Sequence, residues 1–210
     1  MPANKKTNAL SRTVSIKERG PMPVLILTVI CSLCVALLAL TATMTADARE
    51  RQANWLADKN KRALFPQADS FLDMNLEQAG DNIPGAITVD LTTSHPDVDQ
   101  LIAVHKDGDA IGIIIRASSK AYGGRVPVMT GFDLAGRIIG IVVDASSETA
   151  GLGQKTAGDP FTDQFKERTA DDAFADIDAI SSATISSNSV KQSVMEASDA
   201  LRAFIKKGGQ

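Results

Sequence analysis

The stretch Val126-Pro-Val-Met-Thr-Gly-Phe-Asp-Leu-Ala-Gly-Arg-Ile-Ile-Gly-Ile-Val-Val-Asp-Ala145 contains two strand-like runs separated by a turn. The first run extends from Val126 to Phe132, and the second, from Arg137 to Ala145, is the most hydrophobic strand-like run in the chain. Val and Ile favour strands because their branched side chains pack well on a pleated surface. The connecting Asp133-Leu-Ala-Gly136 has the length and the glycine of a hairpin loop. The stretch therefore predicts an antiparallel hairpin.

A second hairpin is predicted upstream, where Leu101–His105 and Ala110–Ala117 flank the segment Lys106-Asp-Gly-Asp109. An Asp-Gly pair between apolar runs is a strong hairpin signal. The run Ala86–Leu91 alternates between apolar and polar residues and follows a Pro84-Gly85 turn, which predicts a further strand.

Helical patterns lie on either side of these strands. One is predicted around Phe161–Arg168, and another follows Asn188, where Val190, Val194 and Ala197 begin an apolar stripe. Strands grouped together with helices at the ends predict an α+β fold with an antiparallel sheet and flanking helices.

A single transmembrane helix is predicted near the N-terminus. No charged residue occurs from Pro21 to Ala46, and Val24–Ala46 is an apolar run of 23 residues. About 20 such residues cross a bilayer, whereas the core of a signal peptide has about 7–15. We therefore expect an uncleaved anchor, followed by a helix over Asp47–Leu64 that ends before Pro66.

The flanking charges predict the orientation of this helix. Five basic residues and one acidic residue precede it, which places the N-terminus in the cytoplasm. The expected organisation is a cytoplasmic basic tail (1–20), a transmembrane helix (21–46), a membrane-proximal helix and linker (47–85), and a periplasmic domain (86–210). Subtracting those six residues from the totals of 22 and 25 leaves 17 basic and 24 acidic residues after the helix, a net charge of −7. Such a surface disfavours nucleic acid as a partner.

Both cysteines, Cys31 and Cys34, lie inside the predicted span. The exported part must therefore be stable without disulfides. The C-x-x-C spacing puts both thiols on one helix face, where packing against a neighbouring helix is the preferred interpretation and a metal cluster shared with a partner protein is the alternative.

The stretch Asp178-Ala-Ile-Ser-Ser-Ala-Thr-Ile-Ser-Ser187 places Thr184 at the predicted start of the C-terminal helix. Ser186, Ser187 and Asn188 are residue types that cap helices. The unpaired N–H groups and dipole of a helix N-terminus can hold a phosphate. Thr184 is therefore a candidate for contact with a phosphorylated ligand, and an ordinary serine-rich cap is the alternative.

Two glycine-containing loops accompany this stretch. Ser147-Glu-Thr-Ala-Gly-Leu-Gly153 follows the most hydrophobic strand, and Tyr122-Gly-Gly-Arg-Val126 precedes another. Glycine lets the backbone turn sharply and approach a ligand closely. Simple strand-end turns are the alternative interpretation of both loops.

Together, the three stretches resemble the FMN-binding domain shared by the G subunit of the Rnf (Rsx) electron-transport complex and the C subunit of the sodium-pumping NADH:quinone reductase. They match its S/T-G-A-T motif, its E-T-P-G-L-G loop and its G-Y-x-G-x-I element, in the family order. The resemblance implies that FMN is bound covalently, through a phosphoester, to Thr184. The other cofactor-binding residues that it implies are Ser181, Ser182, Ala183, Tyr122, Gly124, Glu148, Thr149, Gly151, Leu152 and Gly153.

Three residues depart from the family pattern. Ala121 replaces the first Gly of its element, Ala150 replaces Pro, and Ser182 replaces Gly. A positive φ at residue 182 would disfavour serine.

The layout favours the G subunit of an Rnf complex. It implies a single-pass protein of the bacterial inner membrane that carries electrons within a complex coupling ferredoxin/NAD-type electron transfer to ion translocation. Its implied partners are the A, B, C, D and E subunits, membrane lipid, and a periplasmic flavin transferase that modifies Thr184. Alternatives are the C subunit of a quinone reductase, a membrane scaffold without a cofactor, and a tethered module that binds a soluble phosphorylated ligand.

Independent turnover is not expected. The sequence contains no dinucleotide-binding fingerprint and no cluster of His, Cys and Asp residues that predicts catalytic or metal-binding residues. NAD binding and ferredoxin oxidation would then belong to other subunits.

Overall fold

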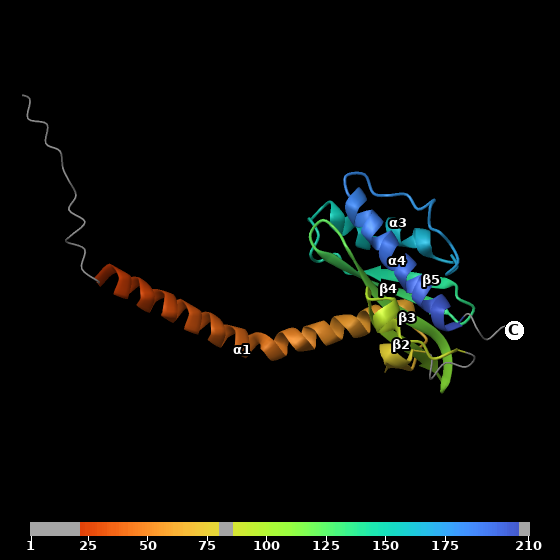
Figure 1. The fold of residues 1–210 in the computed structure, drawn as a ribbon, viewed down its shortest axis with the longest axis horizontal. Coiled ribbons are helices and arrows are strands. Elements are labelled where there is room, and N and C mark those ends of the chain that lie inside the picture. The colour runs from red at the N-terminus through yellow and green to blue at the C-terminus, as the bar shows by residue number, and fades with distance from the viewer. Residues whose placement is uncertain (1–21, 80–85, 206–210) are drawn as a thin grey trace, which may run out of the picture. The chain divides into compact units, whose positions relative to one another are not determined.

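A computed structural model describes residues 22–79 and 86–205 (Figure 1). The chain forms two compact units, Met1–Asn54 and Trp55–Gln210. Helix α1, Met22–Leu64, is the one helix among the described residues that is long and apolar enough to cross a membrane. It includes the predicted apolar run and ends at Leu64, shortly before Pro66, as the stop signals predict. The predicted basic tail lies outside the described residues.

The second unit contains a five-stranded antiparallel sheet in which each strand pairs with its neighbours in the sequence, in the order β1-β2-β3-β4-β5. The strands are β1 (Ser70–Met74), β2 (Val98–Lys106), β3 (Asp109–Lys120), β4 (Arg125–Asp133) and β5 (Ile138–Val143). Both predicted hairpins are present as β2–β3 and β4–β5. The predicted fold class, an antiparallel α+β domain after one long apolar helix, is confirmed.

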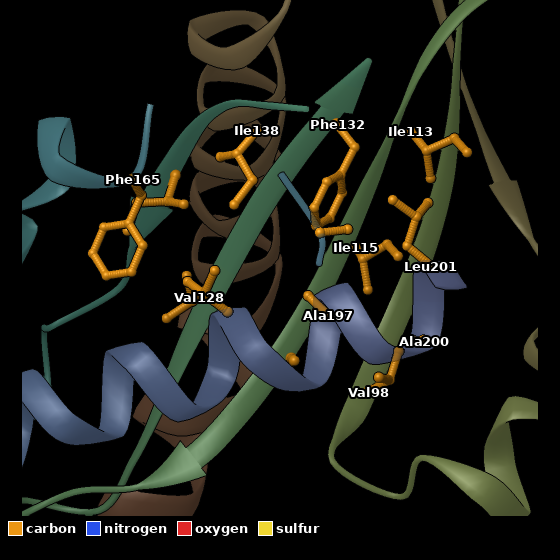
Figure 2. Close-up of a cluster of buried hydrophobic side chains, with 14 of the residues drawn as sticks. Val98, Ile113, Ile115, Val128, Phe132, Ile138, Phe165, Ala197, Ala200 and Leu201 are labelled. Atoms are coloured by element: carbon orange, nitrogen blue, oxygen red, sulfur yellow. The ribbon is translucent and has the colours of Figure 1, made fainter. Parts of the chain in front are cut away.

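The long helix α4, Thr184–Ile205, covers one face of the sheet (Figure 1). Figure 2 shows Ala197 and Leu201 of this helix beside the strands that carry Ile115 and Phe132. Small residues on the buried side of α4 allow the helix to lie close to β3 and β4. Because this packing holds the helix in place, it also fixes the position of the N-terminus of α4.

The opposite face of the sheet is also buried. Leu64 and Phe65, at the end of α1, pack there with Ile102, Ile114 and Met129. Because side chains alternate between the faces, a strand buried on both sides reads as a continuous apolar run. This is why the sequence from Ile113 to Ile115 does not alternate.

Short helical turns complete the unit: η2 (Leu76–Gln78), α2 (Leu91–Ser94), η3 (Gly153–Ala157), α3 (Asp159–Thr162) and η4 (Asp163–Phe165). The last two form the helical segment predicted around Phe161, although they end before Arg168.

The strand predicted over Ala86–Leu91 is wrong. Within it, Val89 makes only an isolated bridge with Ala79, and the chain then enters α2. The Asp90 side chain accepts hydrogen bonds from the N–H groups of Thr92 (2.9 Å) and Thr93 (3.4 Å). This N-cap bonding favours a helical turn over a strand.

The sheet also contains a strand that the sequence pattern did not predict. β1 pairs with β2, with Phe71 opposite Val104, inside the segment expected to be a membrane-proximal helix and linker. β1 lies at the sheet edge and is mostly exposed, so it lacks a regular hydrophobic alternation.

Candidate functional site

Thr184 is the first residue of α4, and its side chain is exposed. The first i→i−4 hydrogen bond of the helix runs from the Ser187 N–H to the Ala183 carbonyl (2.9 Å). The N–H groups of Thr184, Ile185 and Ser186 precede that bond, and such groups have no acceptor within a helix. The predicted helix N-terminus is therefore present and begins at the threonine itself.

Ser186 and Ser187 do not cap the helix from outside, as the sequence suggested, because both are buried within its first turn. The Ser187 hydroxyl donates to the Ala183 carbonyl and accepts from the Ile180 N–H, both at 3.0 Å. These bonds fasten the segment before Thr184 to the helix.

The backbone of Ser182 has a φ of 68°, in the left-handed region. This is the position where the resembling family has glycine, and a side chain there is strained. The turn that presents Thr184 therefore forms despite an unfavourable residue.

The loop after β5 lies beside this turn and is organised by Glu148, which is only 4% exposed. Its Oε1 accepts a hydrogen bond from the Gly123 N–H (2.7 Å), and its Oε2 accepts one from the Ser186 hydroxyl. Glu148 therefore joins the two glycine loops and the first turn of α4, three segments that are distant in the sequence.

These three segments enclose an open cavity of about 450 Å³. This volume lies within the range of about 300–1,000 Å³ that is typical of small-molecule sites. The lining residues are Tyr122, Glu148, Thr149, Leu152, Gly153, Ser182, Ala183, Thr184, Ile185 and Ser186.

Eight of the eleven predicted site residues thus line one cavity, whereas Ser181, Gly124 and Gly151 do not. Gly124 and Gly151 have positive φ values of 150° and 75° and shape the two loops. The sequence did not predict that Ile185 and Ser186 line the cavity. Their position directly after Thr184 at a helix start was the available signal.

The cavity wall combines polar backbone with exposed apolar side chains. Tyr122 is 74% exposed, and Ile185 is 59% exposed. Of the lining residues, none is Lys or Arg, and Glu148 is the acidic one. Backbone N–H groups at the helix start are therefore the groups available to an anion, and the rim suits a flat, largely apolar ring.

Comparison with known proteins identifies this region. Residues 121–199 match the FMN-binding domain. All ten residues that line the cavity lie within this match. The resemblance predicted from the three motifs is therefore confirmed for the part of the chain that carries them.

Two relatives extend the match beyond this domain. The chain is 31% identical over 110 residues to the G subunit of the proton-translocating ferredoxin:NAD(+) oxidoreductase complex of Clostridium ljungdahlii, a match that covers 49% of this chain and 60% of that protein. It is 29% identical over 188 residues to the G subunit of the Na(+)-translocating ferredoxin:NAD(+) oxidoreductase complex of Acetobacterium woodii, over 81% of this chain and 86% of that protein.

Two solved structures are also similar. The C subunit of the Na(+)-translocating NADH-quinone reductase from Parabacteroides distasonis aligns with a TM-score of 0.48 at 17% identity, over 67% of this chain and 79% of that one. NqrC from Shewanella oneidensis aligns with a TM-score of 0.48 at 15% identity, over 70% and 87%.

The region that matches the FMN-binding domain contains residues that fit the two ends of FMN. The N-terminus of α4 offers N–H groups to a phosphate, and the Tyr122, Leu152 and Ile185 side chains offer an apolar rim to a ring. Within residues 22–79 and 86–205, no group of three His, Cys, Asp or Glu side chains is arranged to hold a metal ion.

Proposed function

We propose that this chain is a membrane-anchored electron-carrier subunit in which FMN is esterified to Thr184. The observation that carries the proposal is the position of Thr184: an exposed hydroxyl on the first residue of α4, at the edge of a cavity within the FMN-binding domain. FMN supplies one- and two-electron redox chemistry when it is bound. The chain supplies the attachment point, the phosphate contacts and the orientation of the ring.

The charge of the cavity favours a covalent link over reversible binding. A free phosphate monoester carries a charge of about −1.5 to −2 at neutral pH. The wall offers helix N–H groups and one buried carboxylate, with no cationic side chain among the lining residues. Esterification leaves a diester with a single negative charge, which these N–H groups balance more easily, and the covalent bond prevents loss of the cofactor.

The ester is proposed to form with FAD as the donor, on a separate periplasmic flavin transferase. The Thr184 Oγ forms a bond to the FMN phosphorus, the pyrophosphate bond of FAD breaks, and AMP leaves while the hydroxyl proton is released. No general base lies beside Thr184 in the sequence, so the transferase is expected to supply one.

The partners and location follow from the same proposal. The relatives are subunits of ion-translocating ferredoxin:NAD(+) oxidoreductase complexes. We infer that α1 anchors this chain in the bacterial inner membrane beside the A to E subunits, with the N-terminus cytoplasmic and the sheet domain periplasmic. Five basic residues before α1 support this orientation.

The test is mass spectrometry of the full chain from a host that contains the transferase. Trypsin is expected to release residues 169–191, which hold two threonines, Thr169 and Thr184. We expect a mass increase equal to FMN minus water, localised on Thr184 by fragmentation. Thr184→Val should remove flavin fluorescence from a denaturing gel, and Thr169→Val is the matched control that should retain it.

Three other outcomes would each favour a different function. An unmodified peptide without flavin would favour a scaffold protein, and flavin lost on dialysis would favour a reversible binding module. Gel-stable flavin on the Thr184→Val variant would contradict the proposed attachment site.

A further inference from the structure

Glu148 is a buried carboxylate that the proposed electron transfer does not use directly. Its two oxygens bind different segments, the Gly123 N–H at 2.7 Å and the Ser186 hydroxyl. Across the described parts of the chain, none of the ion pairs includes Glu148. Burying a carboxylate without a cation is costly, so these hydrogen bonds must hold it.

Two glycines make room for this carboxylate. A Cβ atom on Gly153 would lie 2.5 Å from the Glu148 Oε2 and 2.8 Å from the Ser186 Oγ. A Cβ atom on Gly123 would lie 2.1 Å from the Ser147 carbonyl oxygen, next to Glu148. The glycines of both loops thus permit close packing around Glu148, in addition to allowing sharp turns.

The network bears directly on the reactive residue. Ser186 lies in the first turn of α4, two residues after Thr184, so its bond to Glu148 fixes that turn against the loop after β5. The bond from the Gly123 N–H to Glu148 then joins both to the loop that carries Tyr122. We propose that Glu148 is the positioning residue for Thr184: its carboxylate sets the direction in which Thr184 presents its hydroxyl and, after esterification, the flavin. The inference about the flavin depends on the proposed function, whereas the inference about the helix start does not.

The charge of Glu148 has a second consequence. It is the acidic side chain on the cavity wall, and no lining residue carries a cation to compensate for it. A negative charge beside a redox group disfavours electron uptake, because adding an electron raises the repulsion between them. Glu148 therefore lowers the midpoint potential of a flavin held in this cavity.

The experiment compares variants of the full chain that separate shape from charge. Glu148→Gln keeps the side-chain length and removes the charge. Its amide oxygen can still accept from the Gly123 N–H, and its NH2 group can donate to the Ser186 hydroxyl in place of the bond that Glu148 accepts. Glu148→Ala removes the charge and both bonds. We expect Glu148→Ala to be flavinylated about tenfold more slowly than Glu148→Gln, because the two variants differ in the bonds that hold the helix start and small displacements of a reacting group reduce rates strongly.

The midpoint potential is the readout that a purely structural role would not change. Glu148→Gln should shift it to a more positive value. Glu196→Gln removes the same charge from another part of α4, where Glu196 bonds to Gln192, and should leave the potential nearly unchanged. A Glu148→Gln potential equal to that of the unaltered protein would overturn the charge effect.

Amide hydrogen exchange tests the positioning role without flavin. The hydrogen-bonded N–H groups of Ile180, Ala183 and Ser187, which hold the start of α4, should exchange faster in Glu148→Ala and in Ser186→Ala, and Glu148→Gln should restore slow exchange. If Glu148→Ala does not fold, the Ser186→Ala variant still tests whether the bond between Ser186 and Glu148 holds the start of α4. Unchanged exchange and unchanged flavinylation in Ser186→Ala would overturn the proposal. If the unaltered chain carries no gel-stable flavin but the variants still show faster exchange, the proposed function is wrong and the positioning role of Glu148 stands.

Discussion

The Phe65 ring occupies the space where Gly112 would carry a side chain. A Cβ atom on Gly112 would lie 2.5 Å from two carbon atoms of the ring and 2.6 Å from the Phe132 carbonyl oxygen. Phe65 follows the last residue of α1, and Gly112 lies in β3. The glycine therefore allows the residue after α1 to seat directly on the sheet.

Substitution Gly112→Ala is expected to lower the free energy of unfolding by about 1–3 kcal/mol, because an added methyl group in a packed core displaces its neighbours. Gly140→Ala is the matched control on the same sheet. Its Cβ would meet the nearest atom, in the Leu64 side chain, at 3.5 Å, an ordinary contact. Thermal unfolding of the full chain, followed by circular dichroism, should show a clear decrease for Gly112→Ala and little change for Gly140→Ala. Equal effects would contradict the role assigned to Phe65.

Ser182→Gly is expected to stabilise the protein. A non-glycine residue at a φ of 68° is strained by about 1–2 kcal/mol, and the greater freedom of glycine in the unfolded chain offsets part of the gain. The net increase should be about 0.5–1 kcal/mol in the free energy of unfolding, measured by denaturant titration. Ser181→Gly, at a neighbouring residue without a positive φ, should instead destabilise the protein. A loss of stability in Ser182→Gly would show that the serine side chain makes a compensating contact.

The segment that leads to Thr184 is also stabilised by charge. Arg168 donates two hydrogen bonds to Asp176, at 2.6 and 2.7 Å, and another to Asp172 at 3.0 Å. The paired bonds from Arg168 hold the pKa of Asp176 below its ordinary value of 3.8. Because the folded pKa is the lower one, this stabilisation is present above pH 3.8 and is lost as the pH falls through the folded pKa.

Arg168→Gln should therefore raise the pKa of Asp176 to near its ordinary value, as observed by a carboxyl-carbon NMR titration. The stability difference between this variant and the unaltered chain should narrow as the pH is lowered below about 4. Arg137→Gln, which removes a separate pair with Asp133, should leave the Asp176 titration unchanged. A difference in stability that stays constant through this range would contradict the linkage.

The sheet could be predicted well because the strongest signals for its hairpins lie within short stretches of sequence. The Asp-Gly turn between β2 and β3 has φ values of 53° and 90° at residues 107 and 108, which glycine and aspartate tolerate better than most residues. The two elements that the pattern misjudged depend on weaker signals. Asp90 redirects a strand-like run into α2 by capping it, and β1 has too little buried surface to show an alternation.

The residues of the site were easier to predict from the sequence than the hydrogen bonds that join them. Thr184 at the start of α4 and the two glycine loops follow from short stretches of sequence. The bonds of Glu148 reach Gly123 across 25 residues and Ser186 across 38, and no local pattern predicts such a pairing. The cavity forms because the sheet and α4 bring these distant segments together. No short motif in the sequence indicates that these segments are in contact.

The rim of the cavity predicts how a bound flavin is exposed. Tyr122, Leu152 and Ile185 are 74%, 42% and 59% exposed, so these side chains flank the cavity without enclosing it. Exposed apolar side chains that cluster at a site are typical of surfaces covered by a partner. A flavin on Thr184 should therefore be open to solvent in the isolated chain and protected in the assembled complex.

Quenching of flavin fluorescence by iodide measures this exposure. We expect iodide to quench the flavin of the isolated, detergent-solubilised chain readily, and much less efficiently after assembly with the other subunits. Acrylamide, an uncharged quencher, is the control for the net charge of −3, which repels iodide. Ile185→Ser should leave quenching in the isolated chain high but weaken the protection gained on assembly, because it removes apolar surface from the rim without closing it. Full protection of the flavin in the isolated chain, against both quenchers, would show that the loops close over the ring and that the rim is not a partner surface.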